Sequence, residues 1–250
     1  MNTKSTPCWH LKKLLLAHLA IFLLLLSWFL HVTHPFWESM DYYFYRFVNG
    51  FIEDSLFWQN FWAVSNHKLT DWFHDLVVLV FFGAYILKKS EKSTAKKICE
   101  VLFVALLIAA AILVINRYLC LSVLKIQRKS PSMVYDFAVR LSTKVHWISF
   151  KGHSFISYPG DHGTTAILFA MCVFHLMGFR AGILACLYNI YWQFPRLVTG
   201  CHWFTDIIMG SLVISTLVVS WVIYSPFKEW FTNLLSSPFE KYRQRKPIQP

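Results

Sequence analysis

The sequence predicts an all-α, polytopic membrane protein: six transmembrane helices and one interfacial amphipathic segment, in a single domain over residues 1–250. Hydrophobic residues make up 56% of the chain and charged residues only 15%, against roughly 45–50% and 25% in an ordinary soluble domain. The apolar residues lie in blocks, several of which reach the roughly 20 residues that cross a bilayer core. Aromatic residues, at 18%, suit the membrane–water interface. These observations exclude a soluble protein, a disordered chain and a small disulfide scaffold.

The apolar runs set the six expected helices. The first run, residues 14–32, follows Lys12 and Lys13 and is longer than the apolar core of a signal peptide, so we expect it to be retained. Only the short turn at 178–182 separates the fourth and fifth runs, which should therefore form an antiparallel pair. The five later runs cover residues 72–87, 98–123, 163–179, 181–194 and 205–224.

Basic residues gather in tracts beside these runs, at 12–13, 88–97 and 241–246. Such tracts remain on the cytoplasmic side of a membrane, which predicts that both termini are cytoplasmic. The net charge of +11 is then explained by topology and anionic lipid, and no nucleic-acid partner is expected. The outer face receives residues 34–71, 124–162 and 195–202.

Residues 42–64 read YYFYRFVNGFIEDSLFWQNFWAV, an aromatic-rich stretch with scattered charges. We interpret this stretch as an amphipathic anchor that lies in the membrane interface. The alternative is a lid or a lipid-entry surface over the functional site.

Three polar stretches mark the ends of predicted helices. In the last of them, His202 and Asp206 stand four residues apart, which places them on one face of a helix. A carboxylate there can accept one ring N–H of the histidine and leave the other nitrogen free to attack. Arg196 can hold two phosphoryl oxygens in its planar fork. The alternative is an arginine that snorkels to the interface beside an ordinary helix contact.

The second stretch, SYPGDHG at residues 157–163, leads directly into an apolar run. It brings His162 to a helix N-terminus, whose free N–H groups and dipole suit an anion. His162 is therefore a candidate general acid for a leaving oxygen. Asp161 is expected to cap the helix, and the alternative for His162 is a side chain that points into the interface.

The third stretch, KIQRKSP at residues 125–131, places basic residues on the outer face, against the usual topology rule. Cations that topology does not need are candidates for phosphate binding, and Arg128 is the favoured one. Plain contact with lipid headgroups is the alternative for Lys125 and Lys129. Ser130 or Ser132 could add a hydroxyl donor.

Together these stretches resemble the three signature motifs of the type-2 phosphatidic acid phosphatase superfamily, KxxxxxxRP, PSGH and SRxxxxxHxxxD, carried on a six-helix membrane fold. The third motif matches at Arg196, His202 and Asp206 with the same spacing, although Pro195 replaces the serine. The second matches at its proline and at His162.

The other motifs depart from the family pattern. Gly160 and Asp161 stand where Ser-Gly is usual, which removes a hydroxyl that Thr164 or a backbone N–H would have to replace. In the first motif Arg128 precedes Lys-Ser-Pro, and Leu121 occupies the place of the lysine, for which Lys125 would substitute.

These departures resemble a branch of bacterial lipid A phosphotransferases. Enzymes of that branch act in the inner membrane and move a phosphoryl group from undecaprenyl diphosphate to the 1-phosphate of lipid A at the periplasmic face. The resemblance implies the same two lipid substrates and the same location for this chain.

The resemblance also implies roles for individual residues. His202 would attack the terminal phosphorus and form a phosphohistidine, with Asp206 orienting its ring. His162 would protonate the departing lipid phosphate and then act as a base toward the acceptor. No metal or other cofactor is expected, because the sequence has no carboxylate cluster for magnesium and no cysteine pattern for zinc. The phosphoryl oxygens would be held by Arg128, Arg196, Lys125 and Thr164.

Several alternatives stay open. Water in place of the lipid acceptor would give a phosphatase for undecaprenyl diphosphate or another lipid phosphate. A transporter or a non-catalytic lipid-binding protein is less favoured, because the chain lacks the two related halves common in transporters. A small regulatory membrane protein is an open partner. Asn66, Lys68 and Asp71 could rim the site, and Asp75, which follows His74 in the second run, receives no role.

Overall fold

The computed structural model describes residues 8–245, with side chains up to residue 237. Over that range the chain forms helices joined by loops, and the described residues include no strand. The all-α class predicted from the sequence is confirmed.

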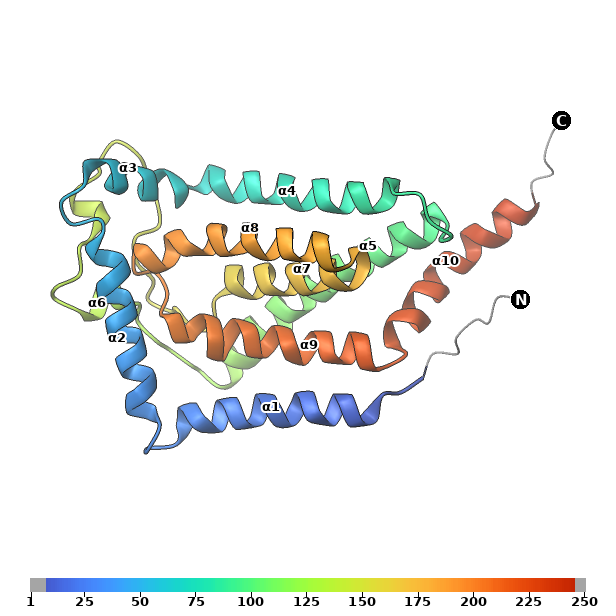
Figure 1. The fold of residues 1–250 in the computed structure, drawn as a ribbon, viewed down its shortest axis with the longest axis horizontal. Helices are drawn as coiled ribbons and strands as arrows, with labels where there is room; N and C mark the ends of the chain where they lie inside the picture. Colours follow the sequence, from blue (N-terminus) through green and yellow to red (C-terminus); the bar gives the residue numbers. More distant parts are fainter. Residues whose placement is uncertain (1–7, 246–250) are drawn as a thin grey trace.

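The long helices lie side by side in a bundle (Figure 1). Each predicted apolar run coincides with one of them. Four are long and apolar enough to cross a membrane, namely α1, α4, the α5–η1 rod and the η3–α9 rod; for α7 and α8 a membrane crossing stays a prediction. The bundle consists of α1 (Leu11–Phe29), α4 (Lys68–Leu87), α5 (Thr94–Ala110) with its π-helical continuation η1 (Ala111–Val123), α7 (Asp161–Met177), α8 (Phe179–Val198), and the π-helical η3 (Asp206–Leu212) with its continuation α9 (Val213–Tyr224).

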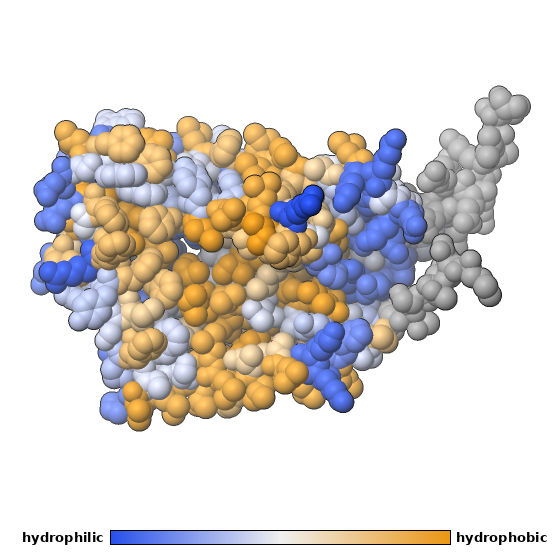
Figure 2. All heavy atoms as spheres, viewed as in Figure 1, coloured by the Kyte–Doolittle hydropathy of each residue, from blue (hydrophilic) through white to orange (hydrophobic). Residues whose placement is uncertain are grey.

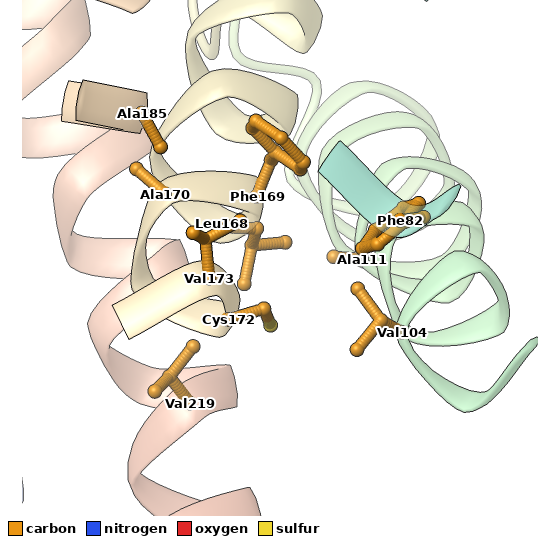
Figure 3. Packing of buried hydrophobic residues seen from close by; sticks show 10 residues of the cluster. All are labelled: Phe82, Val104, Ala111, Leu168, Phe169, Ala170, Cys172, Val173, Ala185 and Val219. Carbon is orange, nitrogen blue, oxygen red and sulfur yellow. The ribbon is translucent and has the colours of Figure 1, made fainter. Parts of the chain in front are cut away.

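Helix α7 lies at the centre of the bundle, which explains why it is shorter than the others. Its inward side chains form the middle of the main apolar cluster (Figure 3). The surrounding members come from α4, α5, η1, α8 and α9. A helix enclosed by other helices is not matched in length to the bilayer as a lipid-facing one is. The α7 members of the cluster are Leu168, Phe169, Ala170, Cys172 and Val173, and the others are Phe82, Val104, Ala111, Ala185 and Val219.

The outer helices expose their apolar side chains. On α1, for example, Leu15, Leu16 and Phe22 are exposed. Figure 2 shows apolar residues gathered across the middle of the bundle, with polar residues toward its ends. A contiguous apolar surface of this kind is what a bilayer covers.

The two ends of the bundle differ. One end is covered by α2 (His34–Gly50), α3 (Leu56–Ser65), the short α6 (Pro131–Val134) and the turn η2 (Leu141–Thr143), whereas α10 (Phe227–Arg245) and the start of α1 lie at the other (Figure 1). The predicted amphipathic stretch 42–64 is thus two helices with a break between them, and the Ser55 hydroxyl accepts the Trp58 N–H at 3.3 Å to start the second. On α2, Tyr45 and Val48 are buried while Phe47 is exposed. That this segment lies in a membrane interface stays a prediction.

The antiparallel pair predicted from the turn at 178–182 is present as α7 and α8. Gly178 ends α7 with a φ of +90°, a conformation that glycine adopts without strain. Gly182 lets the two helices approach closely, because a Cβ there would lie 2.2 Å from ring carbons of Phe174. The hairpin therefore depends on the absence of a side chain at position 182.

We expect Gly182→Ala to lower the free energy of unfolding by about 1–3 kcal/mol, because the added methyl group overpacks this contact. The matched control is Gly83→Ala on α4, where a Cβ would meet nothing within 4 Å. That substitution should leave stability unchanged or raise it slightly, since alanine favours helix over glycine. Thermal unfolding in detergent micelles measures both, and equal midpoints for the two variants would contradict the packing argument.

Candidate active site

The three polar stretches meet at the end of the bundle that α2 covers. Ser157 links the first stretch to the second, because its N–H and its hydroxyl both donate to the Arg128 carbonyl, at 2.8 and 3.0 Å. The carbonyl of Ser157 in turn accepts a hydrogen bond from His202 Nδ1 at 2.7 Å. One residue of the second stretch thus joins all three stretches, a role that the sequence analysis did not assign to it.

His202 is held in one orientation by its Nδ1. A backbone carbonyl only accepts, so Nδ1 carries a proton toward Ser157, and Nε2 is the ring nitrogen left to meet a ligand. Asp206 Oδ2 lies 3.6 Å from the same Nδ1, and its carboxylate is fully buried. The carboxylate therefore stabilises positive charge on the ring, while the shorter contact that orients the ring comes from Ser157.

His202 and Asp206 do not share a helical turn as the spacing predicted. The helix begins at Phe204, and the Trp203 N–H donates to Asp206 Oδ2 at 2.9 Å. Asp206 thus caps its own helix in the manner of a capping box, while His202 belongs to the preceding loop. The two side chains still approach each other, because the cap turns the chain back over the carboxylate.

The PGDHG turn lies against the His202 ring. A Cβ on Gly160 would lie 3.3 Å from His202 Cε1 and 3.4 Å from Nδ1, so glycine permits this approach. Gly160 is also the N-cap residue of α7, and the prediction that Asp161 caps this helix is wrong. The Asp161 carboxylate accepts hydrogen bonds from Asn116 Nδ2 at 3.0 Å and Arg117 Nη2 at 3.1 Å, which tie α7 to η1.

Two of the predicted phosphate ligands are not brought to this cluster. Thr164 is fully buried, and its hydroxyl donates to the Gly160 carbonyl at 3.1 Å and accepts from Asn116 Nδ2 at 3.2 Å. Thr164 thus supports the turn from within. Lys125 is exposed on the loop after η1, with a φ of 51°. Among the residues the structure describes, no hydrogen bond or ion pair connects its ammonium to the cluster.

The serines of the first stretch are also structural. Ser130 is fully buried, and its Oγ accepts the Ser154 N–H at 2.9 Å. The Ser132 hydroxyl donates to the Gly200 carbonyl at 2.8 Å. Both residues fix the loop that carries Arg128.

Arg128 lies between two carboxylates. Its Nη1 donates to Asp206 Oδ1 and to Thr205 Oγ1, each at 2.7 Å, and its Nη2 donates to Asp41 Oδ2 at 2.7 Å. The guanidinium also stacks over the Trp203 ring at 4.6 Å. Burial by itself lowers the pKa of Arg128, but Asp206 and Asp41 outweigh burial and raise the pKa above its ordinary value. Arg128 is therefore a permanent cation with a fixed orientation.

Asp41, on α2, is a site residue that the sequence patterns missed. Its side chain is buried, and it accepts the Thr205 N–H at 2.9 Å and the Thr205 hydroxyl at 2.6 Å. Burial raises the pKa of Asp41 above its ordinary value, even though Arg128 and Thr205 act in the opposite direction. Asp41 thereby fastens α2 to the start of η3.

Arg196 is buried on the last turn of α8. Its Nη1 donates to the Trp192 carbonyl at 3.1 Å, and the guanidinium lies 4.8 Å from the centroid of the Trp192 ring. Its Nη2 donates to the carboxylate of Asp71 on α4. The other oxygen of Asp71 lies 3.7 Å from His162 Nε2. Asp71 therefore connects two predicted site residues, a role that the sequence did not reveal.

The arrangement combines a nucleophile, an acid–base group and two oriented cations. His202 presents a free imidazole nitrogen, and the side chain of His162, about a third exposed at 34%, is accessible to a ligand. Such a set suits transfer of an anionic group through a covalent intermediate. Among the residues the structure describes, no group of three or more His, Cys, Asp or Glu side chains is placed to hold a metal ion.

We expect Asp41→Asn to lower the free energy of unfolding by about 1–3 kcal/mol, because it removes one charge from a buried hydrogen-bonded pair. The matched control is Glu38→Gln, one turn earlier on α2. The Glu38 side chain is 68% exposed, so its loss should change stability by less than about 0.5 kcal/mol. Thermal unfolding of the purified variants checks this difference, and equal losses would mean that Asp41 holds no buried pair.

The chain is similar to two known proteins. The chain is 27% identical over 220 residues to lipid A 1-diphosphate synthase from Escherichia coli strain K12, covering 88% of this chain and 90% of that protein. A crystal structure of a transmembrane PAP2-type phosphatidylglycerolphosphate phosphatase from Bacillus subtilis matches with a TM-score of 0.45 at 14% identity, over 95% of this chain and 99% of that one. No family model matches the chain.

The similarity to the synthase confirms the resemblance recognised from the three motifs. It also confirms that the chain is a membrane enzyme of the lipid phosphotransferase and phosphatase class.

Proposed function

We propose that this enzyme transfers a phosphoryl group from undecaprenyl diphosphate to the 1-phosphate of lipid A, through a phosphohistidine on His202. The observation that carries the proposal is the fixed orientation of the His202 ring, with Nδ1 bonded to Ser157 and the Asp206 carboxylate beside it. Similarity to lipid A 1-diphosphate synthase over most of the chain supports the choice of substrates.

In the first half of the reaction, His202 Nε2 attacks the terminal phosphorus of the donor. A bond forms between nitrogen and phosphorus, and the bond between that phosphorus and the bridging oxygen breaks. His162 donates a proton to the departing oxygen, which leaves as undecaprenyl phosphate. The buried carboxylate of Asp206 stabilises the positive charge that develops on the His202 ring.

In the second half, an oxygen of the lipid A 1-phosphate attacks the same phosphorus. The nitrogen–phosphorus bond breaks, and His162, now neutral, accepts the proton of the acceptor. If water reaches the phosphohistidine first, the same steps release inorganic phosphate, and the enzyme is a lipid diphosphate phosphatase. The identity of the acceptor is therefore what separates the two activities.

Arg128 and Arg196 supply the positive charge that the transferred group needs. A guanidinium has five N–H donors. The hydrogen bonds described above use three of them on Arg128 and two on Arg196. The remaining donors are available to phosphoryl oxygens, whose charge in the transition state is stabilised by fixed cations.

The proposed location is the bacterial inner membrane, with the site facing the periplasm. The basic tract 88–97 joins α4 to α5 at the end of the bundle where α10 and the start of α1 lie, opposite to the site (Figure 1). Basic tracts favour the cytoplasmic side. The site at the other end then meets substrates from the outer leaflet.

We expect purified enzyme in detergent micelles to move label from terminally labelled undecaprenyl diphosphate to lipid A. Thin-layer chromatography of reactions with and without lipid A follows the label. Label on lipid A supports the transferase. Free phosphate in both reactions would replace the transferase with the phosphatase, and no turnover by a folded sample would contradict the proposed function.

We expect His202→Ala to lower transfer by at least about 10³-fold, because the variant lacks the nucleophile. The wild-type enzyme should retain label after donor is added alone, in an acid-labile and alkali-stable form, and the variant should not. The matched control is His146→Ala, whose side chain is exposed on the loop before α7 and which should keep full activity. Retained label in the His202 variant would rule out this residue as the nucleophile.

A further inference from the structure

Asp71 lies between two elements of the site. It belongs to the first turn of α4, and one carboxylate oxygen accepts a hydrogen bond from Arg196 on α8. The other oxygen is 3.7 Å from Nε2 of His162 on α7. The side chain is 35% exposed, so water screens these charges only in part. No other described carboxylate forms an ion pair with either residue.

The groups around His162 show how Asp71 affects the protonation of its ring. Burial of His162 disfavours a positive charge on its ring, and Arg196 and His202, which both face it, disfavour that charge further. His74, on the same helix as Asp71, is buried beneath the Trp192 ring, 3.5 Å between centroids. The negative charge that favours a proton on His162 is therefore that of Asp71.

Asp161, the acidic residue next to His162 in the sequence, does not provide this negative charge. Asp161 directly precedes His162, but its carboxylate is bound to Arg117 and Asn116 from η1. Both oxygens of Asp161 are therefore engaged by side chains of η1. Asp71 also has an arginine partner, but its second oxygen remains directed at His162.

We propose that Asp71 is a positioning residue that stabilises the protonated form of His162 for the departure of the donor lipid phosphate and holds Arg196 in place until the phosphoryl group arrives. This inference rests on the proposed function. The arriving phosphoryl oxygens compete with Asp71 for Arg196. Loss of the carboxylate should therefore lower the rate of the chemical step without weakening the binding of the donor.

The test compares Asp71→Asn, which keeps the shape and removes the charge, with Asp75→Asn, one turn later on α4 where the side chain is exposed. The first readout is an NMR titration of enzyme labelled selectively at histidine, without substrate, with His162→Gln to assign the signal. We expect the midpoint of the His162 titration to fall by about one pH unit in Asp71→Asn and to stay unchanged in Asp75→Asn.

The second readout is the pH dependence of transfer. A general acid must hold its proton, so activity falls as pH rises through the titration of His162. We expect this alkaline limb to move by the same unit toward lower pH in Asp71→Asn, with KM for the donor not raised. The variant Asp71→Glu, which restores a carboxylate, should recover much of the shift.

Unchanged titration and unchanged pH profile in Asp71→Asn would overturn the inference, and so would a raised KM with an unchanged kcat. If Asp71→Asn does not fold, Asp71→Ser removes the same charge and answers the same question. Because the NMR titration needs no substrate, it decides the role of Asp71 separately from the transfer assay, which decides the proposed function.

Discussion

The pairing of Arg128 with Asp206 and Asp41 is the interaction on which the rest of the site depends. Asp206 has no exposed surface, and a buried carboxylate is stable only when it is paired and hydrogen-bonded. Arg128 supplies that pairing from the loop after η1, and Asp41 supplies the second anion from α2. Three segments must therefore come together whenever Asp206 is buried in its charged form. The same carboxylate lies beside His202, so the ion pair that holds these segments together also places a negative charge next to the His202 ring.

A loop can hold a side chain in place when its backbone groups are hydrogen-bonded. The long connection between η1 and α7 has little regular structure, yet Ser157 bonds to Arg128 on one side and to His202 on the other. The hydrogen bond to His202 also selects the ring tautomer. If Asp206 alone oriented the His202 ring, any change in the ion pair between Asp206 and Arg128 would also rotate that ring. The Ser157 carbonyl orients the His202 ring, so Asp206 is left to stabilise positive charge on it.

The sequence predicted the features that depend on composition and short spacing. Bilayer thickness limits helix length, so the apolar runs located the long helices, and the glycine turn located the α7–α8 hairpin. The partners of the arginines could not be found in this way. Asp41 meets Arg128 across 87 residues, and Asp71 meets Arg196 across 125. From the sequence alone, any Asp or Glu predicted on the same face as the arginines could be their partner, and only the folded structure shows which one pairs with each. The expected cap at Asp161 failed for the same reason, because Arg117 lies 44 residues away.

Each arginine of the site thus has a carboxylate partner before any substrate is present. A buried arginine in a membrane protein requires such a partner, because an unpaired cation removed from water is costly. An anion that enters the site therefore does not fill an empty cationic pocket. It adds to, or exchanges with, carboxylates that already orient the guanidinium groups, and its binding free energy is the difference between the two sets of contacts. If a phosphoryl oxygen replaced Asp71 at Arg196, the negative charge of Asp71 would no longer be shared with that arginine. It would then act on His162 at the step in which His162 donates its proton. On this proposal, the carboxylate that stabilises the buried arginine in the empty site also favours a proton on His162 once the substrate is bound.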